Sequence, residues 1–134
     1  MIDLENDIFD YVAKALRAAH SGIDVKAEYV EVPAKFPHVS IVEADNRVLQ
    51  RMRTENIENA ASVMYEVNIY SSKPGVRKTE AKAIANTTDE AFSMIGFTRT
   101  FRGQIPNLKD ATIYRIVCRY AAVIDKNYLI YHSE

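Results

Sequence analysis

Seven arginines occupy positions from which their guanidinium groups could bind carboxylates of another chain. They are Arg47, Arg51, Arg53, Arg99, Arg102, Arg115 and Arg119. A guanidinium carries its donors in a planar fork that matches a carboxylate, so these residues suit pairing across an interface. A solvated surface is the alternative for the set, and contact with DNA is a further alternative for Arg47 to Arg53. Our hypothesis is that these side chains contact a partner or a second subunit.

The other residue types that commonly do chemistry form no recognisable motif. His20, His38 and His132 have no second ligand at the spacing that metal sites use. Cys118 falls on the apolar side of an alternating pattern, where a thiol packs as a small hydrophobe. The serines lack a nucleophile-elbow pattern, and the glycines do not cluster into a phosphate-binding loop.

We therefore expect no catalytic residue, no cofactor, no metal and no small-molecule substrate, and we predict that the protein is not an enzyme. A small enzyme with an unrecognised site remains an alternative, because three convergent side chains require no sequence motif.

The composition fits one domain over residues 1–134. The 17 basic and 18 acidic residues nearly cancel, so no overall charge excess drives binding to nucleic acid or to an anionic membrane. The single cysteine excludes an intrachain disulfide and suits a reducing compartment. No apolar run approaches the ~20 residues of a membrane span, and we expect a soluble protein.

An amphipathic helix over Arg77–Gly96 is the element around which the others are organised. Its small and apolar residues recur at the spacing of one helix face. They are Ala81, Ile84, Ala85, Thr88, Ala91, Phe92 and Ile95. Pro74 and Gly75 form a turn signal before the helix, and Gly96 can adopt the left-handed conformation that ends one. This helix must bury its apolar stripe against a sheet.

A second helix is predicted over Asp3–Ala19, and alternating patterns predict five strands. The strands are Ile23–Val32, His38–Glu43, Val63–Tyr70, Phe97–Ile105 and Ile113–Ile124. The simplest pairing of the first two is a hairpin, and Gly103, Pro106 and Asn107 indicate a bulge and a turn in or after the fourth. The order α-β-β-β-α-β-β predicts an α+β fold, in which a largely antiparallel mixed sheet packs against two helices.

Residues 44–62 have the least regular pattern in the chain. They predict either a long hairpin arm or a variable loop with a helical turn, and we assign a long variable loop. Loops longer than ~12 residues within compact domains are commonly functional or disordered.

Five short strings carry a resemblance to a known family. They are Met64–Ser71, Lys78–Ala81, Gly96–Arg99, Ile105–Leu108 and Thr112–Val117. In this order they resemble the tail-completion, or tail-terminator, proteins of long-tailed bacteriophages and prophages. The similarity covers Met64–Asp125, and the N-terminal half agrees only in its order of elements.

The resemblance implies a virion protein of the head–tail junction that is assembled in the cytoplasm of a bacterial host. Such subunits form a ring, typically a hexamer, on the head-facing end of the tail tube. The ring stops tube polymerisation and offers a docking surface to the head connector. The implied partners are further copies of the chain, the tail tube protein and the head–tail connector protein. DNA passes through such a ring without specific binding, no membrane is involved, and the family supplies no catalytic residues.

A head-side connector adaptor or a DNA-contacting neck protein is the alternative from another class. It predicts that the isolated protein binds duplex DNA with a steep dependence on salt, whereas a terminator should bind tube ends.

Overall fold

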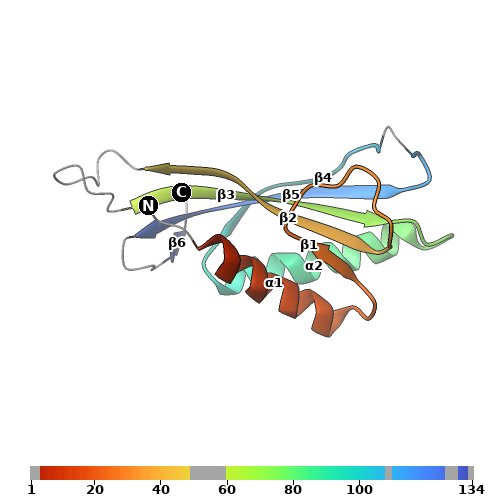
Figure 1. Ribbon diagram of the computed structural model, residues 1–134, viewed down its shortest axis with the longest axis horizontal. Coiled ribbons are helices and arrows are strands. Elements are labelled where there is room, and N and C mark those ends of the chain that lie inside the picture. The colour runs from red at the N-terminus through yellow and green to blue at the C-terminus, as the bar shows by residue number, and fades with distance from the viewer. Residues whose placement is uncertain (1–3, 49–59, 108–109, 126–129, 133–134) are drawn as a thin grey trace.

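The computed structural model describes residues 4–48, 60–107, 110–125 and 130–132. Within these ranges the chain forms two helices and six strands (Figure 1). In order they are α1 (Glu5–Ala19), β1 (Asp24–Lys26), β2 (His38–Val48), β3 (Ala60–Ser71), α2 (Arg77–Met94), β4 (Thr98–Gln104), β5 (Tyr114–Asp125) and β6 (Ile130–His132). The predicted order α-β-β-β-α-β-β is confirmed, and the short β6 is an additional strand after it.

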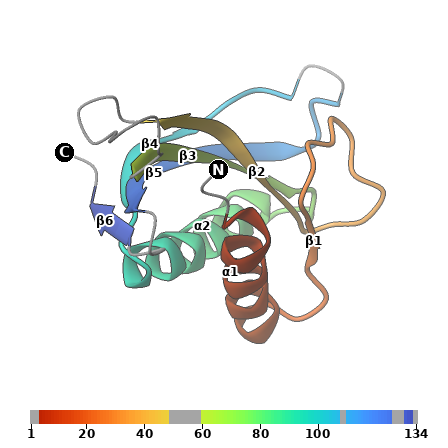
Figure 2. The same cartoon turned by 60° about the vertical axis from the view of Figure 1, so that its left-hand side comes forward.

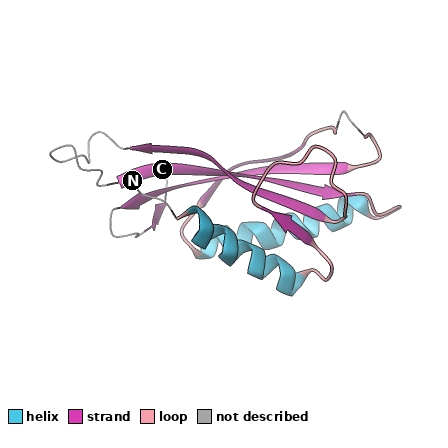
Figure 3. Cartoon of the chain, viewed as in Figure 1, coloured by secondary structure: helices cyan, strands magenta, loops and turns pink. Residues whose placement is uncertain are grey.

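Both helices lie on one face of the sheet, so the fold is α+β as predicted (Figure 3). The strand order is β1-β2-β3-β5-β4, and β6 pairs with β5 beyond the end of β4. Every pair except β1 with β2 is antiparallel. Among the described residues, neither helix is long and apolar enough to cross a membrane.

The predicted hairpin between the first two strands is wrong, because β1 and β2 are parallel. Asp24 pairs with His38 and Lys26 with Ser40. Parallel neighbours require a crossover connection, and residues 27–37 supply it (Figure 2). We call residues 27–37 the covering segment, because they cross the face of the sheet opposite the helices. There, the Ser40 hydroxyl donates to the backbone oxygen of Glu28 at 3.0 Å.

The apolar stripe of α2 is buried as its spacing predicts. Six of its seven residues, from Ala81 to Phe92, are buried, and Ile95 packs partly buried against the same core. Gly96 follows the helix with φ of 92°, in the left-handed region where glycine carries no steric penalty. α2 packs against β3, β4 and β5, and α1 packs mainly beside α2.

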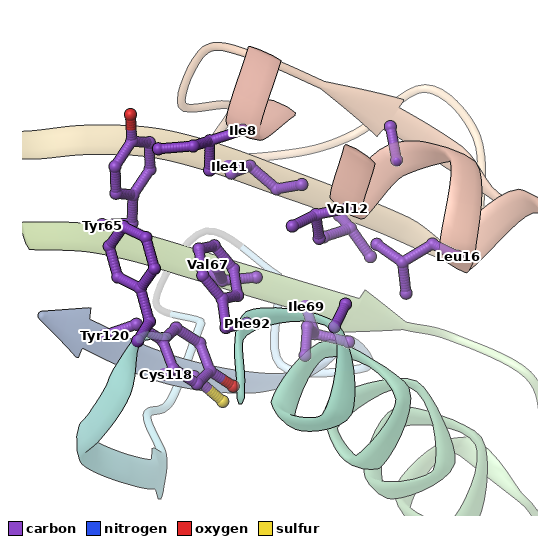
Figure 4. Close-up of a cluster of buried hydrophobic side chains, with 14 of the residues drawn as sticks. Ile8, Val12, Leu16, Ile41, Tyr65, Val67, Ile69, Phe92, Cys118 and Tyr120 are labelled. Atoms are coloured by element: carbon purple, nitrogen blue, oxygen red, sulfur yellow. The ribbon is translucent and has the colours of Figure 1, made fainter. Parts of the chain in front are cut away.

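An aromatic cluster occupies the core between α2 and the sheet (Figure 4). Phe92 stacks on Tyr120, with ring centroids 4.3 Å apart and planes 8° apart. Phe97 meets Phe92 edge-on at 5.3 Å, and Tyr65 lies 5.9 Å from Phe92. Cys118 is buried on the same strand face as Tyr120, as its place in the alternating pattern predicts. The cluster therefore fixes α2 relative to the central strands.

The strands flanking the predicted loop at 44–62 are longer than predicted. β2 runs through Ala44 as far as Val48, and β3 begins at Ala60, so both ends of this interval are strand. The predicted loop is therefore wrong for residues 44–48 and 60–62. The alternative, a long hairpin arm, describes these residues. A register shift between Glu43 and Asp45 explains why period-two alternation fails there. Residues 49–59 lie outside the described part of the chain.

Candidate functional site

A bulge in β4 divides the predicted arginine set between the two faces of the sheet. In the register with β5, Arg99 pairs with Tyr120 and Phe101 with Arg119, which skips one residue of β4. As a result Arg99 and Arg102 both point toward α2. Strict alternation along β4 would have sent these two arginines to opposite faces. The prediction of a bulge at Gly103 is wrong, because the register shift lies between Arg99 and Phe101. Bulges re-aim side chains in this way.

The helix-side arginines form a polar cluster with α2. Nη1 of Arg99 donates to Oδ2 of Asp89 at 2.6 Å. Nη1 of Arg102 donates to Oδ1 of Asn86 at 3.0 Å and lies 3.9 Å from Oδ2 of Asp89. The Tyr120 hydroxyl donates to Oδ1 of Asp89 at 2.6 Å. Asp89 thus connects an exposed arginine to a buried tyrosine.

Tyr120 and Cys118 lie beneath this cluster, and burial determines the protonation of both side chains. It raises the pKa of Tyr120 well above the ordinary value, and interactions with Cys118 and Asp89 raise it further. Burial also raises the pKa of Cys118. Both groups therefore keep their protons at neutral pH, so Tyr120 remains a donor to Asp89 and Cys118 remains an unreactive thiol.

Arg115 lies on the opposite face, under the covering segment. Its Nε and Nη2 donate to Oδ1 of Asn68 at 2.9 and 2.6 Å. Its guanidinium carbon is 5.6 Å from the ring centroid of Tyr29 and 5.9 Å from that of Tyr70. Burial raises the pKa of Tyr70 well above its ordinary value, while the charge of Arg115 opposes that rise. Arg115 is therefore held within its own chain on three sides.

A partly buried histidine–aspartate pair lies on the same face, across Tyr70 from this arginine, and sequence reasoning missed it. Nδ1 of His38 is 2.9 Å from Oδ2 of Asp24, and the His38 side chain is 2% exposed. The two residues are 14 positions apart and meet because β1 and β2 are parallel. Nε2 of His38 and Nδ2 of Asn68 are buried without a hydrogen-bond partner among the described residues. Only knowledge of the parallel register could have predicted the pair.

Arg119 forms a partly exposed ion pair with Glu66 on this outer face. Its Nε and Nη2 donate to Oε1 of Glu66 at 3.3 and 3.2 Å, and the two side chains are 43% and 31% exposed. The guanidinium carbon lies 5.3 Å from the ring centroid of Phe101. Nε of Arg47 lies 2.9 Å from Oδ2 of Asp45, and this pair is more exposed than the pair of Arg119 and Glu66. Exposed pairs of this kind contribute only about 0–1 kcal/mol to stability.

The predicted interface residues that the structure describes therefore lie in three groups. Arg99 and Arg102 face α2, Arg115 and Arg119 face away from it, and Arg47 lies on β2. Arg51 and Arg53 lie outside the described residues. Across the described ranges, no three His, Cys, Asp or Glu residues are grouped so that they could hold a metal ion. Comparison with known proteins yields no matching family model and no matching curated protein.

Proposed function

We propose that this chain is the subunit of a ring that caps the head-proximal end of a phage tail tube. The ring stops tube polymerisation and gives the head connector a surface on which to dock. The observation that carries the proposal is the division of the arginines between opposite faces of one sheet. A closed ring of identical subunits needs two different, complementary patches on each copy, because its interfaces are heterologous. The resemblance over Met64–Asp125 supports the same role.

The outer face supplies one of these patches. Arg119 is oriented by Glu66 and Phe101 yet stays accessible, so its remaining N–H donors can meet a carboxylate of a neighbouring subunit. Because its geometry is already fixed within the chain, little side-chain entropy is lost when the contact forms. The balanced overall charge also suits a ring through which DNA passes, since a strong positive charge would retain the DNA.

Tail assembly in an extract that lacks this chain is the direct test of the role. We expect overlong tails without heads, and we expect the purified protein to restore normal tail length and head joining. Electron microscopy of negatively stained particles measures both outcomes. Tails of normal length in the extract without the chain would overturn the proposal.

An exchange of the Glu66 and Arg119 side chains tests the proposed subunit contact. The E66R/R119E variant retains an intrachain ion pair but reverses the charge at each position. We expect it to fold and to fail to restore tail length, because the carboxylate of the neighbouring subunit now meets a carboxylate. Like charges brought together at an interface cost several kcal/mol.

Circular dichroism of the exchange variant provides the control for folding, and Lys14→Gln on α1 provides a matched surface variant. Lys14 is exposed and belongs to neither arginine cluster. Full rescue by the exchange variant would show that Arg119 serves only its own chain, and the contact would then have to be sought elsewhere. That result would leave the capping role itself intact.

A further inference from the structure

We propose that the groove between α2 and β4 is a binding site for a phosphate group. Its volume is about 310 Å³. The residues that line it are Lys82, Arg99, Arg102, Gly103, Gln104, Tyr114 and Ile116. Every charged residue in this lining is a cation. The inference rests on the groove alone and does not depend on the role in tail assembly.

The two walls of the groove bring their cations together from different elements. Lys82 is an exposed residue on the same face of α2 as Asn86 and Asp89. Arg99 and Arg102 come from β4, and they share one side of that strand only because of the bulge between Arg99 and Phe101. A regular strand would send one of the two arginines to the far face of the sheet. The bulge therefore builds a cationic site at this position.

Both guanidinium groups are oriented before any ligand arrives. Each is held by a single nitrogen, with Nη1 of Arg99 on Asp89 and Nη1 of Arg102 on Asn86. A guanidinium carries five N–H donors, so most of the donors of each side chain remain available for a ligand. Fixing the groups in advance lowers the entropy cost of binding.

The charges and donor directions favour phosphate over carboxylate. Among the described residues, Asp89 supplies the carboxylate that pairs with Arg99 and Arg102, so the three cations of the lining outnumber it and give the groove a local positive excess. A phosphate monoester carries a charge of about −1.5 to −2 at pH 7 and offers several acceptor oxygens in a tetrahedral arrangement. Those oxygens can accept hydrogen bonds from both walls at once, whereas a planar carboxylate presents only two oxygens. The phosphate group could belong to a small phosphomonoester or to the backbone of a nucleic acid.

NMR titration of the full-length chain with inorganic phosphate at constant ionic strength tests the site. We expect saturable shifts of the β4 amides and of the Arg99 and Arg102 side chains, with acetate binding at least tenfold more weakly. Lys82→Gln should weaken phosphate binding by about tenfold, the usual effect of losing one hydrogen bond to a charged group. Lys82 is exposed, so this variant retains its fold.

Lys14→Gln is the matched control, since it removes the same charge from exposed α1 and should leave phosphate binding unchanged. Two further titrations show whether the natural phosphate group belongs to a small phosphomonoester or to a nucleic acid. Glycerol phosphate and a short DNA duplex are each titrated into wild type and into Lys82→Gln. Lys82-dependent binding of glycerol phosphate alone assigns a small monoester. Lys82-dependent binding of the duplex assigns a nucleic-acid backbone. Phosphate binding no tighter than acetate, or equal in wild type and Lys82→Gln, would overturn the proposal.

Discussion

Replacing Phe92 by alanine is expected to lower the free energy of unfolding by about 3–5 kcal/mol, a typical loss when a buried phenylalanine is truncated. Phe92 is 0% exposed and contacts three aromatic rings. Tyr65 comes from β3, Phe97 from the residue before β4, and Tyr120, which stacks on Phe92, from β5. The substitution leaves a cavity at the point where α2, β3 and β5 meet. Because a domain of this size is stable by only about 5–15 kcal/mol, the loss is a large part of the total.

Urea unfolding followed by circular dichroism measures this loss. Met94→Ala is the matched control, because Met94 lies two residues further along the same helix and is 78% exposed. We expect that variant to stay within about 0.5 kcal/mol of the wild type. Similar losses in the two variants would mean that α2 does not pack against the sheet through Phe92.

The sequence was sufficient to predict the elements whose periodicity is uninterrupted. In α2 one face is buried along the whole helix, and in β3 and β5 alternate residues face the core, so the direction of each side chain follows the local pattern. The order of these elements was also sufficient to predict the α+β fold class. The same reasoning correctly placed Cys118 in the core, because a side chain in a regular strand has only two directions available.

The arrangement of the candidate sites could not be predicted in the same way. One skipped residue in β4 moves Arg102 to the face of Arg99, and no local signal marks Thr100 as the position of the bulge. The pair formed by Asp24 and His38 depends on a parallel register that a crossover of 11 residues creates. Both features depend on how one strand pairs with its neighbour. The spacing of residues along a single strand does not predict that register.

Raising the pH above about 9 is expected to destabilise the protein steeply. Three buried groups, Tyr70, Tyr120 and Cys118, have pKa values raised above their ordinary values of 10.0, 10.0 and 9.0, chiefly by burial. Above these ordinary values the unfolded chain releases protons that the folded chain retains. Stability is therefore complete below about pH 9 and falls as the pH rises toward the folded-state pKa values.

The two tyrosines should produce most of this effect. Each lowers the free energy of unfolding by about 1.4 kcal/mol per pH unit once the pH exceeds the ordinary pKa, so together they should remove about 3 kcal/mol by pH 11. Cys118 adds to the loss and begins to act about one pH unit earlier. Urea unfolding at a series of pH values from 7 to 11 measures the slope directly.

Tyr70→Phe separates ionisation from packing, because the Tyr70 hydroxyl is buried and has no hydrogen-bond partner of good geometry among the described residues. Removing it should leave stability at pH 7 unchanged or slightly higher and reduce the alkaline slope. Tyr120→Phe should also reduce that slope, but it loses the hydrogen bond to Asp89 and so should be less stable already at pH 7. Met94→Ala removes no titratable group and should reproduce the wild-type slope. An unchanged slope in both tyrosine variants would show that neither hydroxyl is kept protonated by the fold, and the stacked core around Phe92 would then have to be open to water.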